Sequence, residues 1–193
     1  MLGVGTYAVL VDANVWFSRT LRDWLGMLYT TPDHPPFVAF WTEDILAELI
    51  YHLRKQNPDW PGGRITQIRD LLAGTFEGGR IEDFTIDGEF RGRDPWDRHV
   101  HAAAVACRAD ALVTFNLQDF DQGEDTCCYE LLHPDDFLLL VDDADPGLVR
   151  TVASAMCAYW VRRNGSADLP ARLRAAGCPR FAERILGHLG RMM

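Results

Sequence analysis

Short apolar runs alternate along this chain with segments whose apolar residues recur at helical spacing. Tyr7 to Val11 and Ala111 to Val113 are runs of strand-forming residues, and each is followed by a polar side chain, which predicts two buried strands. Between them, the apolar residues from Ile45 to Leu53 fall on one face of a helix. This alternation of strands and helices predicts an α/β fold.

Turn and capping residues place the remaining elements. A helix is expected from the residues after Asp12 to about Tyr29, where a proline-rich turn ends it. Thr42 is a suitable N-cap for the next helix, which is expected to end near Gln56, before Asn57-Pro58. Three further elements are expected: a helix from Arg64 to Ala73, a second strand from Ile81 to Ile86, and an edge strand from Tyr129 to Leu132.

The C-terminal part of the chain predicts only helices. Asp145-Pro146 is a helix start, and the helix is expected to run from about Gly147 to Arg163, where Asn164-Gly165 breaks it. Two shorter helices are expected to follow, separated by Gly177-Cys178-Pro179. We therefore expect two parts, an α/β domain over residues 1–143 and a helical extension over residues 144–193.

Composition and charge narrow the class of protein. The chain has 193 residues, of which 48% are hydrophobic, enough for one well-filled core. Its net charge of −9 is uneven, because the residues from Gly147 onward include eight arginines and only two acids. That basic region could dock on the acidic body, receive a partner, or face RNA. No apolar run is long enough to span a membrane, no signal peptide is recognisable, and the five cysteines have no CxxC spacing, so we expect a cytoplasmic protein with reduced thiols.

Carboxylates collect where strands end and helices begin. Asp12 follows the first predicted strand, where a buried carboxylate needs either loop amides or a cation. Glu48 lies on the flank of an apolar helix face, and is either an ordinary surface glutamate or a site residue. Asp94 before Pro95 is explained by helix capping alone, whereas Asp97 is not, since one cap suffices.

At four places in order, the chain resembles the PIN-domain nucleases, and especially the VapC-type toxins of bacterial toxin–antitoxin pairs. The similar stretches are VDANV around Asp12, EDILAEL around Glu48, DPWDRHVHAAA around Asp94 and Asp97, and LVTFNLQDF around Asn116 and Asp119. The resemblance covers about residues 7 to 141, and the helical extension is similar to the C-terminal domain of a longer VapC subgroup. It implies a PIN-like three-layer fold, with a central parallel sheet flanked by helices.

The resemblance also implies roles for individual residues. The implied catalytic and metal-binding acids are Asp12, Glu48, Asp97 and Asp119, with Asp94 as a further candidate ligand. Asn14, Thr114 and Asn116 are expected to orient these ligands. Arg91, Arg93 and Arg98 either hold RNA phosphates or form a solvated charged face. Many family members carry one aspartate in the third motif, so the choice between Asp94 and Asp97 as the main ligand stays open.

Elementary electrostatics favours a cation in such a cluster. Crowded carboxylates repel one another, a divalent cation removes that penalty, and ligands that are all oxygen favour Mg²⁺ or Mn²⁺. The implied activity is hydrolysis of RNA, and the implied partners are RNA, a small antitoxin protein and, as a further option, a second copy of the chain. Two alternatives stand beside it, a non-catalytic RNA-binding or assembly module of the same fold and a metal-dependent phosphatase. The haloacid-dehalogenase type of phosphatase requires an aspartate where Asn14 stands.

Overall fold

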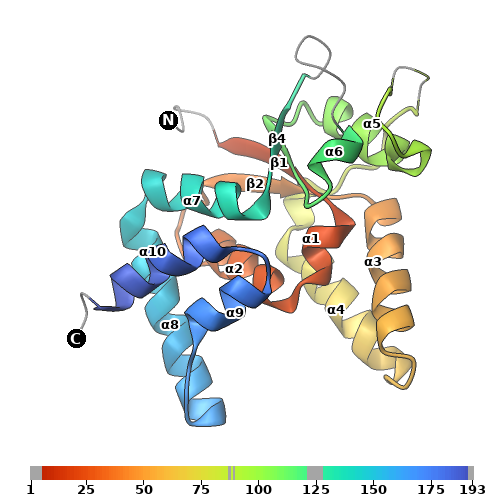
Figure 1. Cartoon of the computed structure of the whole chain (residues 1–193). Helices are drawn as coiled ribbons and strands as arrows, with labels where there is room; N and C mark the ends of the chain where they lie inside the picture. The colour runs from red at the N-terminus through yellow and green to blue at the C-terminus, as the bar shows by residue number, and fades with distance from the viewer. Residues whose placement is uncertain (1–5, 87, 89, 121–127, 191–193) are drawn as a thin grey trace.

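The computed structural model of the protein describes residues 6–86, 88, 90–120 and 128–190. Four parallel strands form one central sheet in the order β2-β1-β3-β4 (Figure 1). The strands are β1 (Tyr7–Val11), β2 (Phe37–Phe40), β3 (Ala111–Val113) and β4 (Glu130–Leu132). The helices are α1 (Ala13–Phe17), α2 (Arg19–Thr30), α3 (Glu43–Gln56), α4 (Gly62–Thr75), α5 (Arg98–Ala106), α6 (Leu117–Phe120), α7 (Pro134–Ala144), α8 (Pro146–Asn164), α9 (Leu169–Ala175) and α10 (Pro179–Gly190), with the short 3₁₀ turns η1 (Glu77–Gly79) and η2 (Pro95–Asp97).

The fold confirms the predicted parallel sheet flanked by helices. In Figure 1, α5 and α6 lie on one side of the sheet and α1, α2 and α7 lie on the other. Because the sheet is covered on both faces, its central strands are apolar throughout: β3 is wholly buried and β1 is buried from Val9 onward. The run from Val9 to Val11 and the run from Ala111 to Val113 pair residue by residue, which makes β1 and β3 direct neighbours.

Two sequence expectations about local structure were wrong. The segment from Ile81 to Ile86 is not a strand, because only an isolated bridge joins Arg80 to Trp41. The neighbouring edge strand β2 stops there, since Thr42 already caps α3, and no further backbone is available for pairing. The true second strand is β2, a short apolar run that the sequence reading passed over.

The helix expected to run unbroken to about Tyr29 is two helices, α1 and α2. The break falls at Ser18, whose backbone is extended and whose side-chain oxygen accepts a hydrogen bond from the Leu21 N–H at 3.4 Å. This is an N-cap interaction, which begins a new helix rather than continuing the old one.

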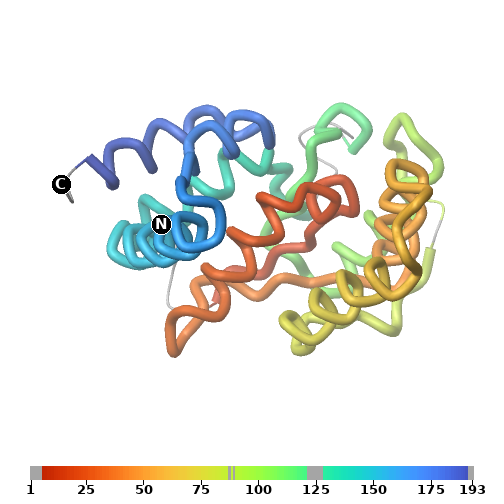
Figure 2. Tube along the Cα trace, turned by 90° about the horizontal axis from the view of Figure 1, so that it is seen from below, coloured from red at the N-terminus to blue at the C-terminus, as the bar shows by residue number. Residues whose placement is uncertain are grey.

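The helical extension packs on the α/β part through one continuous core. Trp24 of α2 lies edge-on to Phe181 of α10, with ring centroids 5.1 Å apart, and both side chains are fully buried. Charges reinforce this packing: the buried Asp142 of α7 accepts hydrogen bonds from Arg184 at 2.8 Å and from His188 at 2.6 Å. Figure 2 shows the extension at one end of the molecule and α3 and α4 at the other, with α1 and α2 between them.

Candidate active site

The candidate site is built on the carboxyl ends of β1 and β3. Asp12 directly follows β1 and is the N-cap residue of α1, with only 4% of its surface exposed. Its backbone N–H donates to the Val113 carbonyl at 3.1 Å, which continues the pairing of the two strands. Thr114 directly follows β3 and is fully buried. Parallel strands end at the same edge of a sheet, so two residues that are 102 positions apart meet there.

Two polar side chains fix the position of the Asp12 carboxylate. Its Oδ2 accepts hydrogen bonds from the Asn14 side-chain amide and the Thr114 hydroxyl, each at 2.7 Å. The Oδ1 of Asn14 in turn accepts from the Phe115 N–H at 3.2 Å, and the Thr114 hydroxyl oxygen accepts from the Asn116 N–H at 3.0 Å. Asn14 and Thr114 therefore orient Asp12, whereas Asn116 joins this network through its backbone and is exposed.

Asp97 is the centre of the electrostatic cluster. It is half-buried, and it precedes α5 without capping that helix through its side chain. Burial and then the charges of the other four acids together raise the pKa of Asp97 to about 7; those acids are, in order of effect, Asp12, Asp94, Asp119 and Glu48. The structure thus brings four other acids close enough to act on Asp97, although the five come from four separate stretches of the chain.

The buried Asp12 is perturbed in the same direction. Burial is the main cause that raises the pKa of Asp12 to about 6, and the charge of Glu48 adds to it. The hydrogen bonds from Thr114 and from the backbone at Ala13 and Asn14 oppose this rise, because they stabilise the ionised form. Two carboxyls whose pKa values are raised first by burial and then by neighbouring carboxylates mark this end of the sheet as a candidate functional site.

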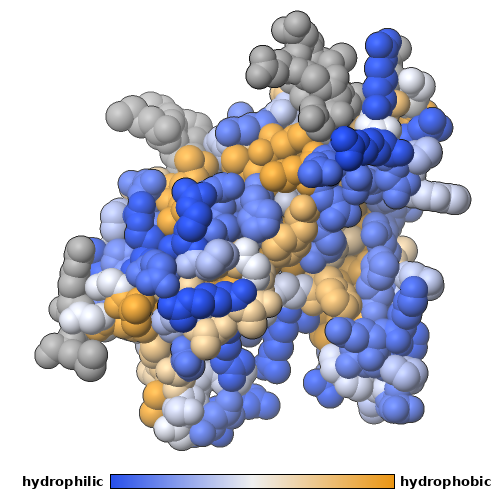
Figure 3. All heavy atoms as spheres, viewed as in Figure 1, coloured by the Kyte–Doolittle hydropathy of each residue, from blue (hydrophilic) through white to orange (hydrophobic). Residues whose placement is uncertain are grey.

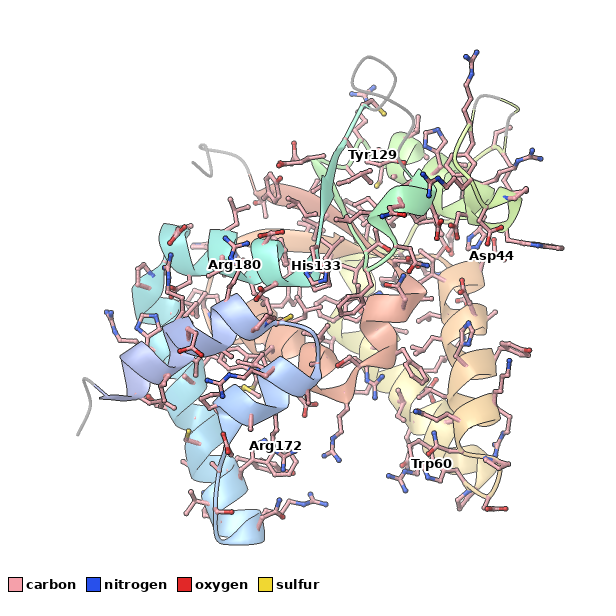
Figure 4. All side chains as sticks on the ribbon, viewed as in Figure 1. Asp44, Trp60, Tyr129, His133, Arg172 and Arg180 are labelled. Atoms are coloured by element: carbon pink, nitrogen blue, oxygen red, sulfur yellow. The ribbon has the colours of Figure 1, made fainter. Side chains whose placement is uncertain are left out.

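Little positive charge compensates this cluster. Within the described ranges, the only ion pair of the five acids joins Glu48 to His52, at 3.4 Å. The nearby Glu43 belongs to a different group, since it pairs with Arg69 and Arg80 at 3.5 and 3.3 Å. Asp44 lies at the same N-terminal end of α3, as Figure 4 shows.

A close backbone contact holds the turn with Asp94 and Asp97 against α6. The Arg93 N–H donates to the Asp119 carbonyl at 3.0 Å. Gly92 makes this approach possible, because a Cβ atom there would lie 2.2 Å from the same carbonyl oxygen. Asp94 caps η2 by accepting from the Trp96 N–H at 2.9 Å, as its position before Pro95 indicated. The sequence did not indicate a role for Gly92, because the need for a glycine at this position arises only from the packing of the turn against α6.

The predicted RNA-binding arginines, Arg91, Arg93 and Arg98, are all exposed near the site. Arg93 donates to the Gln118 side chain at 3.1 Å, so its position is tied to α6.

The other side of the site contacts the extension. Phe115 packs edge-on against His133, with ring centroids 5.0 Å apart, and Gly177 lies against the Phe115 ring, where a Cβ atom would come within 2.9 Å. Sequence reasoning assigned no role to Phe115 or His133.

The donor set suits a hard divalent cation. All candidate ligands are carboxylate oxygens, which favour Mg²⁺ or Mn²⁺ over softer ions. A cation would stabilise the ionised forms of Asp12 and Asp97, which burial and then repulsion between carboxylates disfavour. The acids do not form a ready-made cage, since no group of three His, Cys, Asp or Glu in the described part of the chain is arranged to hold an ion.

Comparison with known families agrees with this geometry. Residues 8–118 match the family model of the PIN domain, so the chain belongs to the PIN domain family. Residues 134–187 match the family model described as the VapC50 C-terminal domain, which makes it a VapC-type PIN protein with a C-terminal extension. Searches of curated proteins and of solved structures found no match.

The two family matches imply a nuclease with a toxin role, an RNA substrate and an antitoxin partner. PIN domains are in general dependent on divalent metal. Among the helices that the structure describes, none is both long and apolar enough to cross a membrane.

Proposed function

We propose that this protein is a metal-dependent endoribonuclease that acts as the toxin of a toxin–antitoxin pair. The observation that carries the proposal is the gathering of four carboxylates around that of Asp97, and in the described ranges these five acids make a single ion pair. Such crowding is costly unless a cation or a reaction makes use of it. The membership of the PIN family and the VapC-type extension support the same conclusion.

The candidate site residues would have different roles in metal binding and catalysis. Asp12 and Asp97 would hold the principal ion, Mg²⁺ or Mn²⁺, and Asp94 is the alternative ligand beside Asp97. Glu48 and Asp119 would complete the site or position the attacking water. When bound, the ion lowers the pKa of water and neutralises charge on a phosphoryl oxygen. Asn14 and Thr114 keep the Asp12 carboxylate in one orientation through their 2.7 Å hydrogen bonds.

The substrate would enter past the exposed basic side chains. Arg91, Arg93 and Arg98 would contact phosphates on either side of the bond that is cut, and they would position the RNA without reading its sequence. Hydrolysis would add water across the phosphodiester, so that one P–O bond forms, the scissile P–O bond breaks, and the leaving oxygen takes up a proton. A homodimer is compatible with this activity but is not required by it.

Cleavage of RNA by the purified protein tests the proposal. We expect cleavage with Mg²⁺ or Mn²⁺ and none with EDTA, and we expect Asp12→Asn and Asp97→Asn to abolish cleavage while they leave the circular dichroism spectrum unchanged. The control is Asp59→Asn, which alters an exposed turn after the C-terminal end of α3 and should cut at the parental rate. If the two site variants cut RNA as fast as the parent with EDTA present, the assignment is wrong.

Growth assays test the toxin role separately. Expression of the parent should arrest growth, co-expression of an antitoxin encoded by a small gene beside its own should relieve the arrest, and Asp97→Asn should not arrest growth. Normal growth at high levels of an enzyme that is active on RNA would exclude the toxin role but keep the nuclease. The non-catalytic alternative, an RNA-binding or assembly module, predicts the opposite of the cleavage result, since Asp12→Asn would then change nothing.

A further inference from the structure

Phe115 is the residue through which the C-terminal part of the chain reaches the candidate active site. It directly follows Thr114, which fixes Asp12, and its ring is partly buried against the core. Two segments lie against this ring: His133, the residue before α7, with ring centroids 5.0 Å apart, and Gly177, in the turn between α9 and α10. In Figure 3 a notch separates the lower part of the extension from α3 and α4, and the molecule is continuous above it, where α7 lies beside the sheet.

A buried carboxylate holds the extension in this position. Asp135 of α7 is 4% exposed, and its two oxygens accept hydrogen bonds from N–H groups in the first turn of α10: Oδ2 from Arg180 at 3.1 Å and Oδ1 from Phe181 at 2.8 Å. A carboxylate at a helix N-terminus also interacts favourably with the helix dipole. Arg180, which Figure 4 shows beside α7, makes a second link through its ion pair with Asp136. The turn that precedes α10 and contains Gly177 is therefore fixed relative to α7.

The ring of His133 is also held from two sides. His133 is the N-cap residue of α7, and its Nδ1 accepts a hydrogen bond from the Asp135 N–H at 3.2 Å. This bond fixes the orientation in which the imidazole lies edge-on to Phe115, at an interplanar angle of 80°. On the other contact, a Cβ atom at Gly177 would lie 2.9 Å from the Phe115 ring, so the backbone of the turn touches the ring directly. Phe115 therefore cannot shift unless the cap of α7 or the turn before α10 also shifts.

The backbone of Phe115 connects these contacts to the candidate metal ligand. Its N–H donates to Asn14 Oδ1 at 3.2 Å. The side-chain amide of Asn14 donates to Asp12 Oδ2 at 2.7 Å and to the Thr114 hydroxyl at 3.0 Å. A displacement of Phe115 therefore acts on the amide that orients Asp12. Core packing alone would explain the ring contacts, whereas the hydrogen bond to Asn14 links them to the carboxylate.

We propose that Phe115 and His133 are positioning residues, through which the extension holds the Asp12 carboxylate in the orientation that cleavage requires. The inference rests on the proposed nuclease function, and it concerns residues that act through Asn14 rather than on RNA or the ion. A displacement of about 1 Å that arises far from the chemistry can cost a reaction about a hundredfold in rate, so indirect contacts of this kind are sufficient to matter. The extension would thereby be a working part of the active site.

His133→Asn separates positioning from stability. Asparagine is a favourable N-cap residue, so the variant keeps the cap of α7 and loses only the ring against Phe115. Its Tm should stay within about 3 °C of that of the parent, while kcat for RNA cleavage should fall about tenfold or more and KM should change less than about twofold. Phe115→Ala should lower kcat at least as far, and Phe115→Leu, which keeps apolar bulk, should restore part of it. The matched control is His34→Asn, which makes the same change at an exposed position before β2 and should leave both constants unchanged.

The side-chain amide of Asn14 provides a readout that needs neither metal nor RNA. In the ¹⁵N–¹H NMR spectrum of the protein in EDTA, its signals should shift or split in His133→Asn and in Phe115→Ala, because both variants release the residue that bonds to Asn14. The same signals should stay in place in His34→Asn. The affinity for Mn²⁺, measured by electron paramagnetic resonance, should weaken about tenfold in the first two variants and not in the control.

Three results would overturn the proposal: a parental kcat in His133→Asn, an unmoved Asn14 amide in that variant, or an equal loss of kcat in Val152→Ala. Val152 is buried in α8, so its truncation destabilises the extension, and an equal loss would mean that activity merely follows stability. A parent that cuts no RNA would refute the proposed function instead. The amide signals and the Mn²⁺ affinity would then still decide whether the extension holds Asp12.

Discussion

Replacing Asp97 by asparagine should stabilise the metal-free protein while it destroys the activity. Asp97 interacts with four other acids and makes no side-chain hydrogen bond to the start of α5, so asparagine of nearly the same shape removes repulsion and sacrifices no capping bond. The Asp97 carboxylate lowers the stability of the fold, and it is kept because the reaction needs it.

The pKa of Asp97 bounds the size of this effect. It rises from 3.8 to about 7, and the shift corresponds to a ceiling of roughly 4 kcal/mol at about 1.4 kcal/mol per pKa unit. Because Asp97 is only half-buried, solvent screens part of the repulsion. We therefore expect Asp97→Asn to raise the free energy of unfolding by about 1 to 2 kcal/mol, or the Tm by about 3 to 6 °C in a chain of this size.

The gain should depend on pH with a definite sign. A folded-state pKa above the unfolded-state value means that ionisation of Asp97 opposes folding, so the parent loses stability as the pH rises from about 4 through about 7. Thermal unfolding in EDTA should therefore show the largest advantage of Asp97→Asn near about pH 8, and a smaller one near about pH 5. Mn²⁺ should raise the Tm of the parent and leave that of the variant nearly unchanged.

A matched substitution guards against a general effect of removing negative charge from an acidic protein. Asp59→Asn makes the same chemical change at an exposed turn, and it should move the free energy of unfolding by less than about 0.5 kcal/mol at either pH. The reasoning would be refuted if Asp97→Asn were no more stable than the parent at about pH 8, or if its advantage were equal at both pH values.

Three further substitutions test contacts that position the site. Gly92→Ala forces a Cβ atom into the α6 carbonyl, so it should destabilise the fold by about 1 to 3 kcal/mol and slow cleavage, whereas Gly88→Ala, with open space around it, should do neither. Gly177→Ala and Gly165→Ala both strain a backbone with positive φ, but only the former meets the Phe115 ring, so only it should slow RNA cleavage. Asp142→Ala leaves the buried His188 without its carboxylate, whereas the exposed Arg184 keeps Asp143, and urea unfolding should show a loss of about 1 to 3 kcal/mol.

The uneven charge of the chain has a structural explanation only in part. Arg180 and Arg184 of α10 pair with the aspartates of α7, and Arg174 pairs with Glu183, so about three of the eight arginines counted after residue 146 serve the packing of the extension. Of the three roles that the sequence left open, covering the acidic body accounts for Arg180 and Arg184. Among the other described arginines of this region, Arg163 and Arg172 lie over the rings of Tyr159 and Trp160, and Arg150 and Arg162 are exposed.

The sequence by itself determined the local elements and the identity of the candidate acids. Strand-forming runs such as the one from Tyr7 to Val11, the cap at Thr42 and the Asp-Pro start at Asp94 act within a few residues, so they can be recognised without coordinates. Where the local signal was ambiguous it misled, as at Ile81 to Ile86, because a strand also needs a partner backbone and β2 ends too early to supply one.

The tertiary structure alone decided what those residues meet. The register of β1 with β3 brings Thr114 to Asp12 across 102 positions, and the packing of one turn on α6 makes a glycine necessary at residue 92. A groove of about 940 Å³ over α2 likewise exists only because α8 stands opposite α3 and α4. Strand pairing, close backbone approach and shared surfaces all depend on contacts between segments that are distant in the sequence. Local sequence patterns extend over only a few residues, so they cannot report the free energy of such contacts.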